Sequence, residues 1–318
     1  MKILVTGAAG FIGYHLCKKL LTGNNYVYGI DNINNYYDVN LKNDRIKILK
    51  KNNNFFFYKK DLQQFNWLTK NFSSNNYDVV IHLAAQAGVR YSLENPKTYL
   101  DNNINVFFNI LELTKKFKIK HLLYASTSSV YGNSKKFPLK EDYPTDKPLS
   151  FYAATKKCNE IMAETYSNLY NFQCSGLRFF TVYGDYGRPD MALFKFTKAI
   201  LNNKKIDLYN KGEHYRDFTY VDDVVYCISK LISKKHKINH EIFNIGNSNP
   251  QYLMKFISII EENLSLKAKY KKMNKQIGDV EKNHANINKI TKLIGANKKI
   301  NIHEGIKKFI NWYKGYYK

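Results

Sequence analysis

The sequence is poor in cysteine and lacks long apolar runs, which excludes several classes of protein. Four of its 318 residues are cysteine, and their scattered positions match neither a disulfide framework nor a metal site. No apolar run approaches the roughly 20 residues of a membrane span. An expected strand begins at residue 2, which leaves no room for a signal peptide. We therefore expect a cytoplasmic protein with no metal site and no membrane partner.

Acidic residues are also scarce, with 26 Asp and Glu against 50 Lys and Arg, so the formal net charge is +24. Such an excess raises the hypothesis of a nucleic-acid or anionic-membrane partner. The lysines are spread throughout a chain crowded with Asn, Ile and Tyr, however, and no basic helix or arginine-rich arm concentrates them. We interpret the charge as an effect of composition and expect no nucleic-acid partner.

Arginine is the rarer of the two basic residues. A lysine-rich chain can retain an arginine where the planar, bidentate guanidinium is needed, although chance retention is the alternative for any single one. Four of the arginines fall within the motifs discussed below. The five arginines are Arg45, Arg90, Arg178, Arg188 and Arg216.

The first stretch with a chemical meaning is residues 2–13. The apolar, β-branched run Lys2–Thr6 predicts a buried strand, and helical spacing follows a glycine-rich turn. Such a turn binds a pyrophosphate through free N–H groups at a helix N-terminus. A second apolar run ends in Asp31, about where a ribose-binding acid belongs, and a carboxylate there favours NAD over NADP. The predicted pyrophosphate-binding residues are Gly7, Gly10, Phe11, Ile12 and Gly13.

Strand-like and helix-like patterns alternate through the first half of the chain, which predicts an α/β fold with a doubly wound parallel (Rossmann) sheet. We expect an NAD-binding domain at 1–180 and a smaller mixed α/β substrate domain at 181–318, with parts of 216–248 returning to the first domain. Strands are expected at Lys2–Thr6, Tyr26–Ile30, Phe55–Tyr58, Asp78–Leu83, His121–Ser126, Cys174–Phe179, Lys205–Tyr209 and Ile242–Ile245. Helices are expected at Leu41–Lys51, Pro96–Phe117, Phe151–Tyr170, Ala192–Leu201, Asp222–Ser233 and Leu253–Leu264.

Further coenzyme contacts are expected where these strands end, because ligands bind at the carboxyl ends of strands in such sheets. Asp61 is placed to hydrogen-bond an adenine. Small residues after the fourth strand let the chain pass close beneath a cofactor. The additional residues predicted to bind NAD are Asn32, Asp61, Leu62, Leu83, Ala84, Ala85, Asn103 and Ser126.

Tyr152 and Lys156 form the most informative pair, since residues four apart lie on one face of a helix. A tyrosine ordinarily titrates near pH 10, but a nearby ammonium and an oxidised nicotinamide both favour the phenolate. We expect Thr127, at the end of the fifth strand, to share a proton with Tyr152 and the substrate. An isolated Tyr-x-x-x-Lys pattern usually has no meaning; the preceding dinucleotide motif gives this one its weight.

Taken together, these motifs resemble the extended short-chain dehydrogenase/reductases that act on nucleotide sugars. Longer stretches are similar to UDP-glucuronate 4-epimerases, and the resemblance covers nearly the whole chain before weakening after about residue 265. The stretches that carry it are Asp31–Lys42, Ala85–Tyr99, Phe151–Ala163, Leu177–Ile200, Arg216–Asp223 and Phe243–Ser248.

The resemblance implies a transient oxidation at C4 of a UDP-sugar, with NAD regenerated in each turnover and Thr127, Tyr152 and Lys156 as catalytic residues. It implies that Arg216 binds the diphosphate. Ser128, Thr181 and Arg188 make a reasonable clamp for a C6 carboxylate, and Arg90 is either a diphosphate or sugar contact or an exposed loop cation. It also implies a homodimer that pairs 103–117 and 151–170 of each subunit.

Other functions remain open at this point. A UDP-galactose/glucose 4-epimerase is the alternative enzyme, and an RNA-binding protein on the same scaffold is the alternative class. Ser128 and Ser129 stand where related dehydratases and decarboxylases carry acids, which argues against both of those activities. Asp185 and Tyr186 replace the Pro-Trp usual in the family, which predicts a looser loop around Arg188. No uridine or diphosphate contact is assigned within 265–290.

Overall fold

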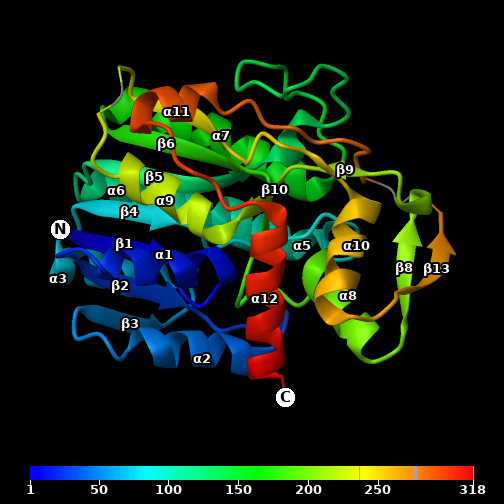
Figure 1. The fold of residues 1–318 in the computed structure, drawn as a ribbon. Coiled ribbons are helices and arrows are strands. Elements are labelled where there is room, and N and C mark those ends of the chain that lie inside the picture. Colours follow the sequence, from blue (N-terminus) through cyan, green and yellow to red (C-terminus); the bar gives the residue numbers. More distant parts are fainter. Residues whose placement is uncertain (236, 275–277, 318) are drawn as a thin grey trace.

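The structure is a computed structural model that describes residues 1–235, 237–274 and 278–317. Its centre is a seven-stranded sheet in the order β11-β6-β5-β4-β1-β2-β3, with all neighbours parallel (Figure 1). The order reverses between β1 and β4, where such sheets bind ligands. The predicted α/β doubly wound fold is confirmed. The strands are β1 (Lys2–Thr6), β2 (Tyr26–Asp31), β3 (Phe55–Lys59), β4 (Val79–His82), β5 (His121–Thr127), β6 (Gln173–Phe179) and β11 (His240–Ile245).

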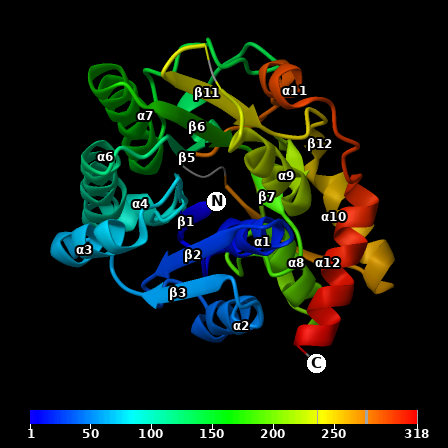
Figure 2. The same ribbon diagram turned by 90° about the vertical axis from the view of Figure 1, so that its left-hand side faces the viewer.

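Helices cover both faces of this sheet (Figure 2). Side chains alternate across a strand, so Ile3 and Val5 enter one apolar core while Leu4 enters the other. Both faces are therefore apolar, which explains why the strands read as continuous hydrophobic runs. One face carries α1 (Phe11–Leu21), α2 (Val39–Leu49) and α9 (Val221–Leu231); the other carries α3 (Phe65–Asn75), α6 (Val106–Lys116) and α7 (Phe151–Tyr170).

A smaller part lies beside the carboxyl ends of the strands (Figure 1). It contains helices α8 (Ala192–Leu201) and α10 (Leu253–Leu264) and the parallel pair β8 (Lys205–Tyr209) and β13 (Lys269–Met273). The predicted limits 1–180 and 181–318 stay a prediction, but β11 lies in the large sheet beside β6. The remaining elements include β7 (Thr181–Tyr183) with β10 (Phe218–Tyr220), β9 (Tyr215–Arg216) with β12 (Gln251–Tyr252), and helices α4 (Tyr91–Glu94), α11 (Asn288–Ile294) and α12 (Ile302–Tyr316).

Three helices, α7, α8 and α10, have the bounds predicted from the sequence. The long helix predicted over 96–117 forms one continuous helical stretch, made of α5 (Pro96–Tyr99), a π-helical turn (Leu100–Asn105) and α6. The sequence patterns did not predict α3, α11 or α12. Within the described part of the chain, no helix combines the length and the apolar character needed to cross a membrane.

Arg178 on β6 and Glu160 on α7 form a buried ion pair beneath the sheet edge. Arg178 Nε and Nη2 donate to the two carboxylate oxygens at 2.8 and 2.9 Å, and the Ser126 hydroxyl donates to Oε1 at 2.6 Å. Burial alone would raise the pKa of Glu160, but Arg178 and Ser126 outweigh it and hold that pKa below its ordinary value. Arg178 is thus a structural residue.

We predict that Arg178→Met lowers the free energy of unfolding by about 3 kcal/mol, because it leaves a buried carboxylate without its main partner. The loss of free energy should lie at the lower end of the range for broken buried ion pairs, since Lys157 remains 3.5 Å from Glu160. Urea denaturation at pH 7 measures it. Because the folded-state pKa of Glu160 is depressed, the pair stabilises above the unfolded pKa, and this stabilisation is lost as pH falls through the folded pKa.

The matched control for this prediction is the double variant Arg178→Met/Glu160→Leu, which removes both charges. It should recover most of the lost free energy, since apolar replacement of a buried pair is often neutral. A double variant as unstable as the single one would show that packing around Arg178, rather than its charge, supports the fold.

Candidate active site

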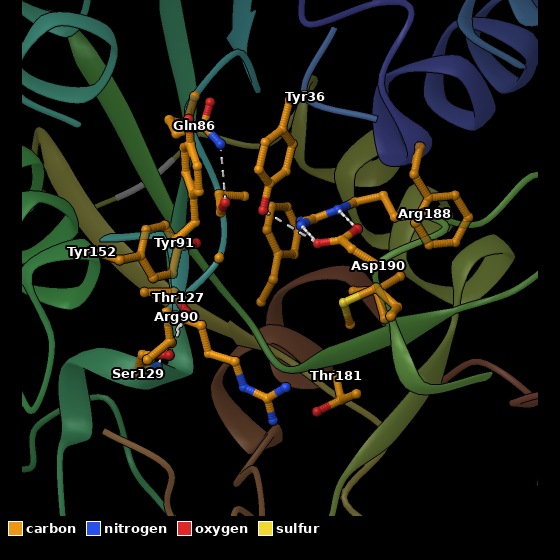
Figure 3. Close-up of a pocket in the computed structure, with 18 of the residues that line it drawn as sticks. Tyr36, Gln86, Arg90, Tyr91, Thr127, Ser129, Tyr152, Thr181, Arg188 and Asp190 are labelled. Atoms are coloured by element: carbon orange, nitrogen blue, oxygen red, sulfur yellow. Dashed lines mark hydrogen bonds and ion pairs between the residues drawn. The ribbon is translucent and has the colours of Figure 1, made fainter. Parts of the chain in front are cut away.

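A cavity of about 940 Å³ lies along the carboxyl ends of the strands, between the large sheet and the smaller part. It is lined by the glycine-rich turn, by the ends of β2, β4 and β5, by the start of α7 and by residues of α8 and β8. Every predicted site residue except Asn103 contributes to this one wall. Figure 3 shows the part of the pocket that contains Thr127, Tyr152 and Arg188.

The glycine-rich turn has the geometry that a pyrophosphate requires. Gly7 has a φ of +73°, and a Cβ on it would lie 2.8 Å from Ala84 N. A Cβ on Gly13 would lie 2.0 Å from Gly7 O, so only glycine permits this packing of helix against strand. Tyr14 N makes the first hydrogen bond of α1, to Gly10 O, which leaves the preceding N–H groups for an anion.

Asp31 ends β2 beside this turn. Its Oδ2 accepts a hydrogen bond from Ala9 N at 3.1 Å and its Oδ1 accepts one from Ile33 N at 2.8 Å. Burial raises the pKa of Asp31, while these two N–H groups and the Lys42 ammonium oppose the rise. The carboxylate is thereby fixed at the cavity wall, with lone pairs left for ribose hydroxyls. The turn and Asp31 together fit a dinucleotide.

Tyr152, Lys156 and Thr127 meet at the junction of α7 and β5. Burial raises the pKa of Tyr152, whereas a hydrogen bond with Thr127 and the charge of Arg188 both lower it. Lys156 lies one helical turn further along and is 2% exposed; its burial lowers its pKa to about 8. The protein's own groups therefore leave the phenol protonated at neutral pH, so the positive charge of an oxidised nicotinamide would be needed to favour the phenolate.

Arg188 does not face the cavity as an unpaired cation. Its Nε donates to Asp190 Oδ1 at 3.0 Å and its Nη2 to Oδ2 at 2.5 Å, and the Tyr36 hydroxyl donates to the same carboxylate at 3.4 Å (Figure 3). Asp190 thus fixes the orientation of the guanidinium. Thr181, predicted to act with Arg188, lines the same cavity.

The other two arginines predicted to bind substrate lie toward the smaller part. Arg90 is exposed and stacks on the ring of Tyr209, 4.6 Å from its centroid. Arg216 Nη2 donates to Asp279 Oδ1 at 2.8 Å, and its Nη1 donates to Glu281 O at 3.1 Å. Burial lowers the pKa of Arg216, and Asp279 opposes that effect. Both side chains line the cavity. A diphosphate contact stays the prediction for Arg216, and Arg90 stays either a diphosphate or sugar contact or an exposed loop cation. Residues 275–277, within the segment where no contact was assigned, lie outside the described residues.

Asn103 is a correction to the predicted coenzyme site. It is 1% exposed and lies behind the wall rather than in it. Its Nδ2 donates to Gln86 O and Thr155 Oγ1, and its Oδ1 accepts from Gln86 N at 2.8 Å. Both amide N–H groups are bonded inside the protein, so Asn103 ties the loop after β4 to α7. Its neighbour Asn102, in the same π-helical turn, lines the cavity.

The loop that carries Arg188 is also held more firmly than its sequence predicted. Asp185 accepts a hydrogen bond from the Tyr220 hydroxyl at 2.7 Å, and its carbonyl oxygen lies 2.9 Å from His15 Nε2. The Tyr186 ring packs between Tyr14 and Trp312, with centroids 5.0 and 4.9 Å away. The expected loosening was wrong, because α12, which the sequence patterns did not predict, supplies Trp312.

Several cavity residues were not anticipated. Tyr36 and Lys42 come from the segment after β2, and Asp190 and Asp279 pair with the arginines discussed above. Lys42 is buried and donates to Asn34 O at 2.7 Å, which shapes this segment. Irregular loops give no periodic signal, so the sequence patterns did not predict Tyr36, Asp190 or Asp279 as cavity residues.

Comparison with known proteins agrees with this geometry. A model of the NAD dependent epimerase/dehydratase family matches residues 3–246. Protein CapI of Staphylococcus aureus is 51% identical over 334 residues, covering 100% of both chains. UDP-glucuronate 4-epimerase of Thermodesulfobacterium geofontis is 45% identical over 312 residues, which are 98% of this chain and 95% of that protein.

A solved structure adds the same result at the level of the fold. The crystal structure of UDP-glucuronic acid 4-epimerase from Bacillus cereus, in complex with UDP-glucuronic acid and NAD, matches with a TM-score of 0.94. The two sequences are 34% identical, and the match covers 99% of each chain. The chain therefore belongs to the NAD-dependent epimerase/dehydratase family, as an NAD-dependent nucleotide-sugar 4-epimerase.

Proposed function

We propose that the chain interconverts UDP-glucuronate and UDP-galacturonate through a 4-keto intermediate. The observation that carries the proposal is that Arg188, oriented by Asp190, lines the same cavity as Tyr152. In a hexuronate, the C6 carboxylate is attached to the carbon next to C4. A cation beside the base that acts on C4 is therefore where the carboxylate would need it.

Tyr152 acts as the base in this proposal. As phenolate it accepts the proton of the sugar 4-hydroxyl, and Thr127 passes that proton through its hydrogen bond. Bound NAD supplies the acceptor, and later the donor, of the hydride at C4. Lys156, one helical turn further along, orients the nicotinamide ribose. After the 4-keto sugar has rotated in the site, the hydride returns to the opposite face of C4, and Tyr152 returns the proton to the C4 oxygen.

The carboxylate needs separate control, because a 4-keto uronate is a β-keto acid that can lose carbon dioxide. Arg188, Thr181 and Ser128 all line the cavity and form the proposed carboxylate clamp. Ser128 and Ser129 are hydroxyls that cannot serve as the acid and base of a dehydration. Arg216 and Arg90 are proposed to bind the UDP diphosphate.

The test is NMR analysis of UDP-glucuronate incubated with the purified enzyme and no added NAD. Appearance of UDP-galacturonate supports the proposal, and a pentose product with release of carbon dioxide contradicts it.

One observation favours a second candidate, a UDP-galactose/glucose 4-epimerase: Asp190 already neutralises Arg188. Higher kcat/KM with UDP-glucose than with UDP-glucuronate would select that candidate. Salt-dependent RNA binding by a protein purified without NAD would support the RNA-binding alternative instead.

We predict that Thr127→Val lowers kcat/KM for UDP-glucuronate about 100-fold, since general acid–base contacts contribute on this scale. The acidic limb of the pH profile should also move to higher pH, because the Thr127 hydrogen bond lowers the pKa of Tyr152. Thr127→Ser keeps a hydroxyl and should retain the wild-type limb. An unchanged limb in the valine variant would remove Thr127 from the proton path.

A homodimer is also proposed, on the evidence of the outer surfaces of α6 and α7. Phe108, Ile161 and Leu169 are 45%, 54% and 68% exposed there, and Tyr170 adds a further exposed ring. Exposed large apolar side chains gathered on adjoining helices are typical of an association surface.

A cytoplasmic location stays a prediction from cysteine usage.

We predict that Leu169→Lys together with Ile161→Lys converts a dimer to a monomer, because each change buries a charge in the proposed contact. Size-exclusion chromatography with light scattering measures the mass. Leu266→Lys is the matched control, since Leu266 is 44% exposed but lies in the smaller part, and it should leave the mass unchanged. A wild-type monomer at micromolar concentration would contradict the proposal.

A further inference from the structure

Arg45 on α2 is a buried cation that the proposed mechanism does not use. It is 0% exposed, and among the described residues its hydrogen bonds go to three carbonyl oxygens and one hydroxyl. Nη1 donates to Ala9 O and the Tyr37 hydroxyl, each at 2.7 Å. Nη2 donates to Tyr186 O at 2.6 Å and Gly187 O at 3.4 Å.

This arrangement is costly for a residue that only fills space. Burying a cation costs several kcal/mol unless its surroundings compensate, and Arg45 Nε lies buried with no hydrogen-bond partner in the described residues. Such a group is more consistent with a specific task than with packing. The identity of its carbonyl partners indicates what that task is.

The three carbonyl groups belong to two different parts of the active site. The Ala9 peptide donates its N–H to Asp31, the acid at the coenzyme end, and offers its oxygen to Arg45. On the other side, Gly187 immediately precedes Arg188, the proposed carboxylate ligand. One guanidinium therefore connects the coenzyme-binding turn to the backbone that presents Arg188.

We infer that Arg45 is a positioning residue that couples the coenzyme turn to Arg188 and so contributes to selection of a uronate. The inference rests on the proposed function. Bound coenzyme fixes the turn, Arg45 passes that constraint to residues 186–187, and Arg188 is held ready for the carboxylate. A lysine cannot replace it, because a single ammonium lacks the planar fork that reaches both carbonyl groups.

Arg45→Lys on the NAD-loaded enzyme tests this role, with binding of UDP-glucuronate, UDP-glucose and UDP measured by calorimetry. We expect the Kd of UDP-glucuronate to rise about tenfold, the scale of one weakened charge-assisted contact. The Kd values of UDP and UDP-glucose should stay within about twofold, since neither ligand has a carboxylate. Asp44→Asn is the matched control: Asp44 adjoins Arg45 on α2 and bonds Tyr316, but touches neither carbonyl.

Equal weakening of all three ligands would overturn the inference, because Arg45 would then support the fold rather than Arg188. An unchanged Kd for UDP-glucuronate would overturn it as well. If the wild-type enzyme itself shows no preference for UDP-glucuronate over UDP-glucose, the proposed function fails instead. Hydrogen exchange then decides the coupling: NAD should protect the amides of 186–190 in the wild type and not in Arg45→Lys, and equal protection in both would refute it.

Discussion

Replacing Tyr152 by phenylalanine is expected to reduce turnover of UDP-glucuronate by about 1,000-fold or more, within the range for loss of a general base. The variant loses only the hydroxyl, so the ring can still pack edge-on against Tyr99, 6.0 Å away. Stability and coenzyme content should therefore match the wild type. Single-turnover analysis by NMR measures the effect directly, because product formation needs no added reagent.

Tyr99→Phe provides the control for this expectation. Tyr99 also lines up beside the catalytic ring, but its hydroxyl donates to Ala87 O and Gly88 O and has no part in the proposed proton path. The Tyr99→Phe variant should be less stable than the wild type but should keep the rate of the chemical step. A Tyr152→Phe enzyme with more than a tenth of wild-type turnover would show that another group removes the proton.

The second large effect is expected from Arg188→Met, which should lower kcat/KM for UDP-glucuronate about 100-fold. Removal of one partner of a desolvated charge pair costs about 3 kcal/mol. Two causes act together here: the substrate carboxylate loses its cation, and the pKa of Tyr152 rises because Arg188 lowers it in the wild type. The acidic limb of the pH profile should therefore move upward as well.

Comparison of substrates separates these two causes. UDP-glucose lacks the carboxylate, so its binding should change little in Arg188→Met. The shift of the acidic limb, which comes from Tyr152, should be seen with UDP-glucose as well. Thr181→Asn is the companion variant and should weaken the binding of UDP-glucuronate but not that of UDP-glucose. If Arg188→Met bound both sugars as the wild type does, the carboxylate clamp would have to be sought elsewhere in the cavity.

The sequence predicted the strands and helices whose apolar residues recur at a regular spacing. The strands from β1 to β6 are apolar on both faces, and α7 begins with Ser150, whose hydroxyl accepts a hydrogen bond from Ala153 N. The helix α3 was missed because little of it is buried: Leu68 and Phe72 are its only fully buried apolar residues. α12 was also missed, although its buried residues Ile302, Ile306, Phe309 and Ile310 recur at helical spacing and pack on α8 and α10.

The candidate site was predictable where backbone geometry dictates the residue, and less so elsewhere. Glycine at positions 7 and 13 is required by close packing, and the Tyr152–Lys156 spacing follows from the helix. Of the two adjacent asparagines, Asn102 lines the cavity and Asn103 does not, a difference that spacing alone did not reveal. Asp190 lies only two residues from its partner Arg188, whereas Asp279 and the carbonyl partners of Arg45 come from segments far apart in the chain, which only the folded structure brings together.

The return of β11 to the large sheet has a consequence for how the chain can be divided. A fragment ending at residue 180 would keep β6 but lose its neighbour, and the freed edge would expose a row of unpaired peptide groups. It would also lose α9, whose apolar side covers α1. The sheet that ends in the coenzyme-binding turn therefore includes one strand and one covering helix from beyond residue 180, and such a fragment would lack both.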